Sequence, residues 1–360
     1  MTDGTEDALR VVQWTTGNVA VEVVKALLNR PDFVLVGAYA YSADKVGVDV
    51  GMLCNLGREL GVRATNDVDS LMTPAPDCVV YTPLRFNVVE VQQILRAGVN
   101  IVTSAEFMTG INLSGSDRAA VQAAALAGNA TIFGSGMNPG FAQMVAAISS
   151  GVSTDVRKAS MTESVDVSQF IGDANFQSVG WGRPRDDPGH ADDVRRGTSV
   201  FAEAVDLFAR LMRIELDEIR SDIDFAYATE NVVADGVSIP IGHVGGMDVK
   251  WYGVVGGHEV LAVKQRWVAT HALDPPWKVE HGYRIEVVGN PTVYVKVDLM
   301  PTDDDLANLT PERMRGIGLR ITAAPLVNAI PQVCAAAPGI ITYAELPAIC
   351  ARLSGRPAPE

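Results

Sequence analysis

The first third of the chain alternates short apolar runs with segments of helical periodicity. The apolar runs predict strands over residues 9–14, 33–41, 61–65, 78–83, 100–105 and 131–136. Between the first two runs, apolar residues recur at helical spacing from Val19 to Leu27, and Pro31 ends that pattern. Nearly continuous apolar strands that alternate with amphipathic helices predict a parallel sheet covered on both faces. Such a sheet binds ligands at the carboxyl ends of its strands.

The pattern changes after about residue 152. Strand-like runs then follow one another, interrupted by one predicted helix over residues 199–212, which favours an α+β domain with a largely antiparallel sheet. The run over residues 258–273 is apolar on both faces, so we expect both faces to be covered, one of them by a second subunit. The polar segment 172–198, rich in glycine and proline, predicts a functional lid or a mobile loop.

Helical periodicity returns after Pro301, with Thr310 as the expected N-cap and Pro311 as the first helical residue. The chain is therefore predicted to be α/β in three parts. Residues 1–145 contain the parallel sheet, 146–303 the α+β region with its largely antiparallel sheet, and 304–360 a helical segment.

Composition narrows the functional classes. The 360 residues contain 43 acidic and 29 basic side chains, a net charge of -14, which argues against nucleic-acid and anionic-membrane partners. We find no apolar stretch near the ~20 residues of a membrane span, no export signal, and four scattered cysteines, so we expect a cytoplasmic protein. The five histidines lack metal-ligand spacing, so we assign no metal, and no nucleophile motif of hydrolases occurs.

The turn after the first predicted strand reads WTTGNVA, a GxxGxxA pattern with Trp14, Gly17 and Ala20 in the three slots. A glycine lets backbone amides approach a pyrophosphate, and a small residue lets the helix pack on the strand. The pattern also occurs in plain α/β turns, but its place between strand and helix favours a dinucleotide. The expected contacts are Thr15, Thr16, Gly17, Asn18 and Val19.

The second predicted strand ends without the acid that usually holds the ribose hydroxyls of NAD. Ser42 can donate to a 2′-phosphate and Lys45 supplies positive charge, which favours NADP. Asp44 keeps NAD open, and a plain surface turn is the alternative. Thr82 and Pro83, at the end of the fourth strand, are further cofactor contacts. Because the net charge repels phosphates, cations such as Lys45 and Arg85 must offset it locally.

Two later strand ends carry further candidates. Glu106 follows the fifth strand beside Phe107 and Met108, where a poorly solvated carboxylate could act as a general base; a solvent-facing loop residue is the alternative. The sixth strand runs into GSGMNPGF, where Asn138 is the expected N-cap of a helix and a cofactor contact, or part of a purely structural turn. The candidate substrate-pocket residues are Met137, Phe141 and Trp181.

Together, the segments WTTGNVA, SADKVG, SAEF, GSGMNPGF and NAIPQVCAAAPGI resemble the native NAD(P)H-dependent amine dehydrogenases. These are similar to 2,4-diaminopentanoate dehydrogenase and, more remotely, to dihydrodipicolinate reductase in the N-terminal domain. The resemblance spans nearly the whole chain. It implies a Rossmann dinucleotide-binding domain over residues 1–145, an α+β substrate and dimerisation domain over 146–303 that forms a homodimer, and a helical segment over 304–360 that packs back on the Rossmann domain. It also implies reductive amination of a ketone or aldehyde with ammonia, or its reverse.

The resemblance also assigns a role to one residue. The catalytic glutamate of the family falls on Glu106, which would take a proton from ammonium or amine and steady the iminium ion. The lysine and paired histidines of dihydrodipicolinate reductases are absent, which disfavours that activity. We expect a small, mostly apolar carbonyl substrate. The alternatives are a carbonyl reductase or alcohol dehydrogenase, a reductase like dihydrodipicolinate reductase, and a non-catalytic NADP sensor.

Overall fold

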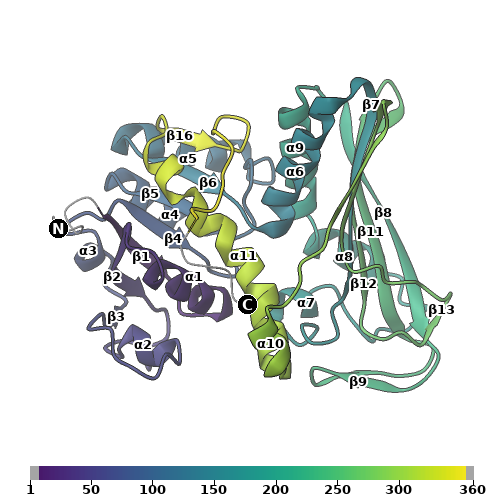
Figure 1. Cartoon of the computed structure of the whole chain (residues 1–360), viewed down its shortest axis with the longest axis horizontal. Helices are drawn as coiled ribbons and strands as arrows, with labels where there is room; N and C mark the ends of the chain where they lie inside the picture. Colours follow the sequence, from purple (N-terminus) through teal and green to yellow (C-terminus); the bar gives the residue numbers. More distant parts are fainter. Residues whose placement is uncertain (1–7, 354–360) are drawn as a thin grey trace. The chain divides into compact units, whose positions relative to one another are not determined.

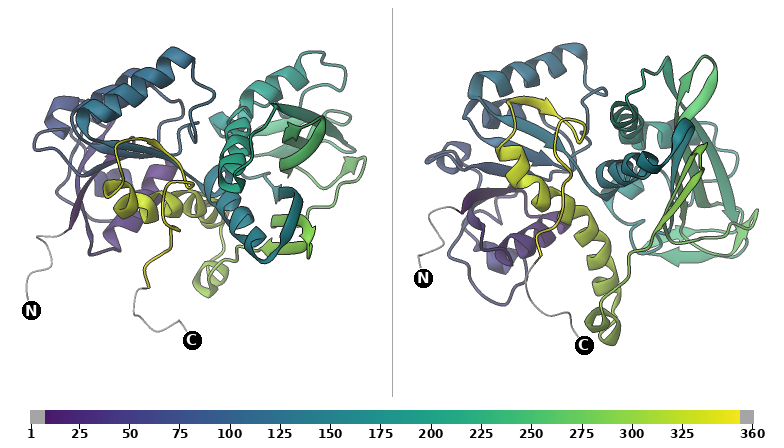
Figure 2. Two further views of the ribbon diagram at one scale, coloured as in Figure 1. Left: turned by 90° about the horizontal axis from the view of Figure 1, so that it is seen from above. Right: turned by 45° about the horizontal axis from the view of Figure 1, so that its top comes forward.

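The computed structural model describes residues 8–353, which form two compact units (Figures 1 and 2). Of the described residues, the first unit contains 8–107, 113–137 and 319–353, and the second contains 108–112 and 138–318. The first unit is built on a parallel sheet and the second on a mixed, mostly antiparallel sheet, which confirms the predicted fold class.

The first unit has a seven-stranded sheet in which every pair of neighbouring strands is parallel. Its strands are β1 (Leu9–Trp14), β2 (Phe33–Tyr39), β3 (Ala64–Thr65), β4 (Cys78–Tyr81), β5 (Asn100–Thr103), β6 (Thr131–Gly134) and β16 (Gly339–Ile341). Their order across the sheet is β16-β6-β5-β4-β1-β2-β3. The chain therefore reverses its direction of travel across the sheet between β1 and β4. That is the point where parallel sheets usually bind ligands.

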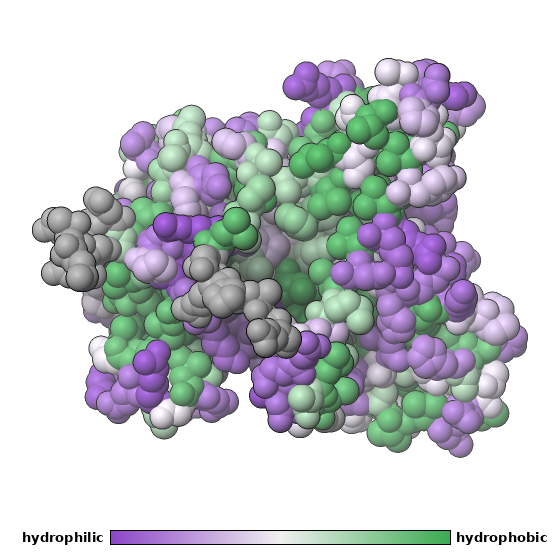
Figure 3. Space-filling view, viewed as in Figure 1, coloured by the Kyte–Doolittle hydropathy of each residue, from purple (hydrophilic) through white to green (hydrophobic). Residues whose placement is uncertain are grey.

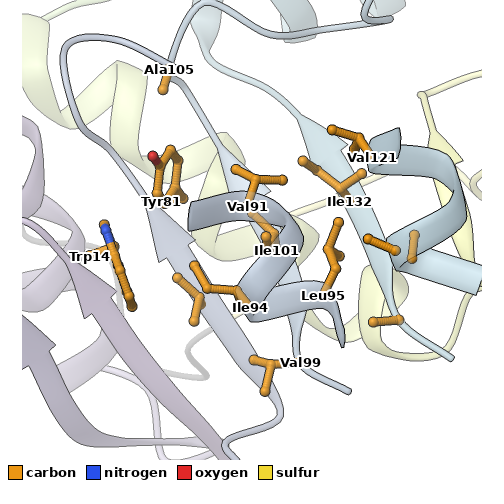
Figure 4. Packing of buried hydrophobic residues seen from close by; sticks show 14 of the residues in the cluster. Trp14, Tyr81, Val91, Ile94, Leu95, Val99, Ile101, Ala105, Val121 and Ile132 are labelled. Atoms are coloured by element: carbon orange, nitrogen blue, oxygen red, sulfur yellow. The ribbon is translucent and has the colours of Figure 1, made fainter. Parts of the chain in front are cut away.

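Helices cover both faces of this sheet. They are α1 (Asn18–Leu28), α2 (Val50–Leu53), α3 (Val68–Leu71), α4 (Val88–Arg96) and α5 (Gly115–Gly128). A core cluster fills the space between the sheet and α4 and α5, and includes Val91, Ile94, Ile101 and Ile132 (Figure 4). Burial of these fully enclosed side chains supplies the hydrophobic free energy that holds the strand ends, and thus the site, in place.

The second unit has a seven-stranded sheet and a small hairpin. The strands are β7 (Thr154–Asp166), β8 (Glu218–Ala228), β9 (Val232–Ala234), β10 (Val237–Ile239), β11 (Val244–Val255), β12 (His258–Val268), β13 (Leu273–Asp274), β14 (Gly282–Asn290) and β15 (Val293–Val297). The sheet order is β13-β8-β11-β12-β7-β14-β15, and β9 pairs with β10. All pairs in the large sheet are antiparallel except β12 with β7.

Two helices, α6 (Ala142–Ser149) and α9 (Val200–Met212), lie on one face of this sheet (Figures 1 and 2). The Trp251 indole on that face donates to Thr198 Oγ1, just before α9. On the other face of β11 and β12, the alternating side chains carry charge. There Arg266 and Lys264 pair with the buried carboxylate of Asp248, at 2.6 and 3.0 Å. One face of β12 is thus covered by helices, and the other is an ion-pair ladder.

The segment 172–198, which the sequence predicts to be a functional lid or a mobile loop, is packed and partly helical. It contains α7 (Ala174–Gln177) and α8 (His190–Gly197). Trp181 is 7% exposed, and buried His190 stacks on Phe225 and hydrogen-bonds through Nε2 to the Val179 carbonyl. Within the segment, Arg183 forms an ion pair with Asp193. Aromatic burial and charge pairing order this segment despite its polar composition.

The last helices are α10 (Asp303–Ala307) and α11 (Pro311–Cys334). Thr310 Oγ1 accepts from the Arg313 amide, as its predicted role as N-cap requires. Within the first unit, Arg30 Nη1 at the end of α1 donates to Asn328 Oδ1 of α11 at 3.1 Å. Hydrophilic and hydrophobic residues are intermixed on the surface seen in Figure 3.

Helix α11 corrects the expectation that no segment is apolar enough to span a membrane. Residues Glu312–Cys334 reach the necessary length, with a mean hydropathy of 1.2. A core helix of a globular unit meets the same test, and α11 buries Leu326, Ile330 and Val333. The helix is therefore weak evidence for membrane insertion.

Candidate functional site

The turn between β1 and α1 leaves backbone amides open at a helix N-terminus. Gly17 is the N-cap of α1, and within residues 8–353 no side chain caps that helix. A Cβ placed on Gly17 would meet no described atom within 4 Å, so the space in front of the turn is free. Uncapped first-turn amides and the helix dipole together favour an anion. Asn18 is exposed beside Gly17, and Thr16 and Val19 are half-buried.

Trp14, which departs from the glycine expected in the first slot, is a core residue. It is fully buried, and its indole stacks on the ring of Tyr39 in β2, with centroids 4.2 Å apart and 6° between the planes. The two rings pack side by side on neighbouring strands, so Trp14 stabilises the sheet. Gly17 is therefore the residue of this turn that a ligand can approach.

The carboxyl ends of β1 and β4 are tied together by threonines. Thr82 Oγ1 lies 3.1 Å from Thr15 Oγ1 and 3.2 Å from the Trp14 carbonyl oxygen, and it accepts from Gln13 Nε2 at 2.8 Å. Thr15 has a φ of +86°, a conformation that a side chain rarely adopts without outside support. The structure therefore brings Thr15 and Thr82 together at the switch point of the sheet, with Pro83 half-buried next to them.

The loop after β2 forms a turn in which the Lys45 amide donates to the Ser42 carbonyl at 3.0 Å. Ser42 and Asp44 are exposed, and Lys45 forms no ion pair within the described part of the chain. Arg63, which the sequence analysis did not single out, donates from Nη1 to the Gly47 carbonyl at 2.8 Å. One cationic side chain, Lys45, thus belongs to the loop in which a 2′-phosphate was predicted to bind, and a second, Arg63 before β3, contacts that loop through the Gly47 carbonyl.

A second group that the sequence did not indicate joins the segment after β2 and the end of β4 to helix α4. The hydroxyls of Tyr41 and Tyr81 both donate to Glu90 Oε2 of α4, each at 2.7 Å. Burial, and then the hydrogen bond to this carboxylate, raise the pKa of both tyrosines, which stay protonated donors. Tyr41 remains half exposed, so its ring forms part of the surface on this side of the β1 end.

Glu106 stands just past the end of β5 with its side chain 43% exposed. Arg85, in the segment after β4, donates from Nη1 to Glu106 Oε1 at 3.0 Å and to Oε2 at 3.3 Å. The expectation that Phe107 and Met108 desolvate the carboxylate is wrong. Both side chains are buried, and Phe107 stacks on Phe86 with centroids 4.8 Å apart. Phe107 therefore anchors the loop while Glu106 faces solvent.

In the second unit, Asn138 is not the N-cap of a helix. Residues Asn138 to Gly140 have non-helical dihedral angles, and α6 begins at Ala142 with Phe141 as its N-cap. The Asn138 amide is instead fixed by side chains: Nδ2 donates to Glu163 Oε2 at 2.5 Å and Oδ1 accepts from Gln143 Nε2 at 3.0 Å. Gly140, at φ +126°, needs the conformational freedom of glycine here.

Glu163 of β7 is the carboxylate at the centre of this cluster. Its Oε1 accepts from Trp267 Nε1 at 3.0 Å, and Trp267 packs against the rings of Phe176 and Phe201. Burial raises the pKa of Glu163, while the hydrogen bonds from Asn138 and Trp267 act against that rise. The sequence offered no signal for this residue, because a single acid in a strand usually faces solvent.

The candidate pocket residues fall in different parts of the chain. Met137, which is buried, closes the second segment of the first unit, whereas half-buried Phe141 and buried Trp181 belong to the second unit. The structure thus brings the predicted residues of the β1, β4 and β5 ends together in one unit. Among residues 8–353, no three histidine, cysteine, aspartate or glutamate side chains are arranged to hold a metal ion.

Comparison with known proteins places this arrangement in a family. Residues 141–356 match the 2,4-diaminopentanoate dehydrogenase C-terminal domain. The chain is 26% identical to an amine dehydrogenase of Streptomyces virginiae over 94% of its own length and 96% of the relative's.

Two solved structures share the fold. The amine dehydrogenase of Mycobacterium smegmatis has a TM-score of 0.77 at 23% identity, over 97% of this chain and 99% of that one. An oxidoreductase from Agrobacterium radiobacter, in complex with NAD+, L-tartaric acid and magnesium, has a TM-score of 0.51 at 14% identity, over 91% and 89%. The chain therefore belongs to the family that carries the 2,4-diaminopentanoate dehydrogenase C-terminal domain, and it is an oxidoreductase of the dehydrogenase type.

Proposed function

We propose that this protein is an NAD(P)H-dependent amine dehydrogenase that converts a ketone or aldehyde and ammonia to an amine, and catalyses the reverse reaction. The observation that carries the proposal is the solvent-facing Glu106 carboxylate, paired with Arg85 at the end of β5. It lies on the same sheet as the open β1–α1 turn. The family of the second unit and the name of the Streptomyces virginiae relative support the substrate class.

The residues of the first unit fit a nicotinamide dinucleotide. The free space at Gly17 and the uncapped amides of α1 suit a pyrophosphate, and Thr15, Thr16, Asn18 and Val19 surround that turn. A structural neighbour was solved with NAD+, which supports this cofactor class. We favour NADP, with Ser42, Lys45 and Arg63 around the 2′-phosphate, and keep NAD as the alternative. Thr82, Pro83 and Asn138 are the further proposed contacts.

Glu106 is proposed to act as the general acid–base group of the reaction. Its carboxylate takes a proton from ammonium, so that ammonia can attack the carbonyl carbon and form a carbinolamine. Glu106 then gives this proton to the carbinolamine hydroxyl, which leaves as water, and the restored carboxylate stabilises the positive iminium group. When bound, the nicotinamide supplies the hydride that reduces this group. Arg85 holds the carboxylate by an exposed ion pair, worth only about 0–1 kcal/mol, so an ammonium ion can compete for the same oxygens.

The substrate pocket is proposed to be mostly apolar, with contributions from Met137, Phe141 and Trp181. We expect a small carbonyl compound, no nucleic-acid or membrane partner, and a homodimer in the cytoplasm. A carbonyl reductase or alcohol dehydrogenase on the same fold, a reductase like dihydrodipicolinate reductase, and a non-catalytic NADP sensor are the alternatives.

The test is NADPH oxidation across a panel of ketones and aldehydes, with and without ammonium. The proposal expects turnover only with ammonium, and a loss of about 10²–10⁴-fold in Glu106→Gln, the usual contribution of a general acid–base group. The matched control is Glu59→Gln, since Glu59 is exposed in the same unit and forms no ion pair within residues 8–353. Ammonium-independent turnover would indicate a carbonyl reductase, and tight NADPH binding without turnover would indicate a sensor.

A further inference from the structure

Glu203, in the first turn of α9, is a fully buried carboxylate that binds a loop. Its Oε2 accepts from the backbone amides of Met108, Thr109 and Gly110, at 2.5, 2.9 and 3.1 Å. Its Oε1 accepts from the amide of Asn112 at 3.1 Å. One side chain thus receives four backbone hydrogen bonds from five consecutive residues, all within the second unit.

These contacts compensate the buried charge of Glu203. A buried carboxylate is costly unless its oxygens are hydrogen-bonded, and bonds to an ionised acceptor are the strongest of their kind. The N-terminal turn of α9 adds a favourable dipole for a negative group. Asn112 Nδ2 also donates to the Ser199 carbonyl at 2.9 Å, just before the helix. The position of residues 108–112 is therefore set by the start of α9.

The loop held in this way begins two residues after Glu106. Glu106 itself has a φ of +48°, in the left-handed region that residues other than glycine rarely adopt. Such a conformation costs about 1–3 kcal/mol and persists only where neighbouring structure enforces it. Before Glu106, the Ala105 amide donates to Thr103 Oγ1 at 3.0 Å, and after it Phe107 is locked in the core.

We propose that Glu203 is a positioning residue for Glu106, which rests on the catalytic role proposed above for Glu106. By binding the amides of residues 108–112, Glu203 fixes the chain immediately after the left-handed turn and so keeps the Glu106 carboxylate directed at the substrate. Glu203 is fully buried, so it acts through the loop and does not touch substrate. Its contacts also explain why residues 108–112 belong to the second unit while Glu106 belongs to the first.

Glu203→Gln is the informative variant because it keeps the size of the side chain. One amide oxygen can still accept three of the bonds, whereas the new NH2 group faces a backbone donor and loosens the loop. Since a shift of about 1 Å in a reacting group can cost on the order of 100-fold in rate, we expect kcat to fall by about 10- to 100-fold. The dissociation constant of NADPH should stay unchanged. Glu203→Asp serves as the second variant if Glu203→Gln does not fold.

A double-mutant cycle tests whether Glu203 acts through Glu106. We expect the Glu106→Gln/Glu203→Gln enzyme to be no slower than Glu106→Gln alone. The control is Leu207→Ala, which removes a buried side chain from the same helix and should lower thermal stability without lowering kcat by more than about 2-fold.

Two results separate the possible failures. If Glu106→Gln loses turnover but the two effects multiply, or if Glu203→Gln only lowers thermal stability as Leu207→Ala does, Glu203 is a structural residue and the positioning role is overturned. If Glu106→Gln keeps full turnover, the proposed function of Glu106 fails, and the positioning role fails with it.

Discussion

Replacement of Gly17 by alanine should separate cofactor binding from stability. Gly17 has a φ of -83°, which alanine adopts without strain, and a Cβ there meets no described atom within 4 Å. Replacing glycine by alanine at a compatible position stabilises a protein by about 0.4–1 kcal/mol, because the unfolded chain has less conformational entropy to lose. Alanine is a poorer N-cap than glycine by a similar amount, so the two effects oppose each other. The free energy of unfolding of the cofactor-free protein should therefore change by less than about 1 kcal/mol.

The same methyl group should weaken the dinucleotide. It occupies the free space in front of the first-turn amides, through which a pyrophosphate must approach. The loss of one charge-assisted hydrogen bond costs about 1.5–3 kcal/mol. Converted at 1.4 kcal/mol per factor of ten, this corresponds to an increase in the Kd of NADPH of about 10- to 150-fold.

The assay combines NADPH titration, followed by the fluorescence of the reduced nicotinamide, with thermal unfolding in the absence and presence of NADPH. A ligand that binds only the native state raises Tm by mass action, so the shift should shrink in Gly17→Ala. Gly115→Ala is the matched control. Gly115 likewise lies at the start of a helix in the same unit, with no described atom within 4 Å of its Cβ position, but it is the first helical residue and the Ser114 side chain caps that helix.

Equal NADPH affinity in Gly17→Ala and the wild-type protein would refute the assignment of this turn to the pyrophosphate. An equal loss in Gly17→Ala and Gly115→Ala would refute it as well, because the effect would then come from helix N-termini in general.

Two further predictions concern charge. Lys45→Ala and Arg63→Ala should each raise the Kd of NADPH by about 10-fold or more and leave that of NADH nearly unchanged, since only NADPH carries the 2′-phosphate; a parallel loss for both cofactors, measured by titration, would contradict the NADP preference. The second concerns Glu163, whose pKa burial raises above 4.5, so the folded state binds its proton more tightly than the unfolded state. The stability of the wild-type protein relative to Glu163→Gln should therefore be greatest at or below pH 4.5 and decline as the pH rises; urea midpoints with a pH-independent difference would contradict this.

The sequence was a good guide wherever structure depends on local pattern. The strand over residues 9–14 appears with the predicted bounds, because its apolar pattern acts within a few residues. The predicted strand over 33–41 ends at Tyr39. Beyond it, Tyr41 hydrogen-bonds to Glu90 of α4. Strand ends are thus less predictable than strands, because contacts with distant elements decide them.

The candidate site shows the same division. A glycine at the first strand-to-helix turn and a glutamate after the fifth strand could be found from residue type and order alone. The aromatic Trp14, the solvent-facing pose of Glu106 and the true start of α6 after Asn138 could not. Each depends on a partner far along the chain: Tyr39 for Trp14, Arg85 for Glu106 and Glu163 for Asn138.

By itself, the sequence determined a parallel α/β unit followed by a largely antiparallel one, together with the strand ends at which a ligand would bind. Those features follow from hydrophobic period and turn chemistry, which are local. Only the tertiary structure decided that Glu203 holds the backbone of residues 108–112, 91 to 95 residues away in sequence, and that half-buried Glu163 lies at the centre of a polar cluster. A carboxylate can be buried only where folding brings hydrogen-bond donors to it, and no local sequence pattern encodes those donors.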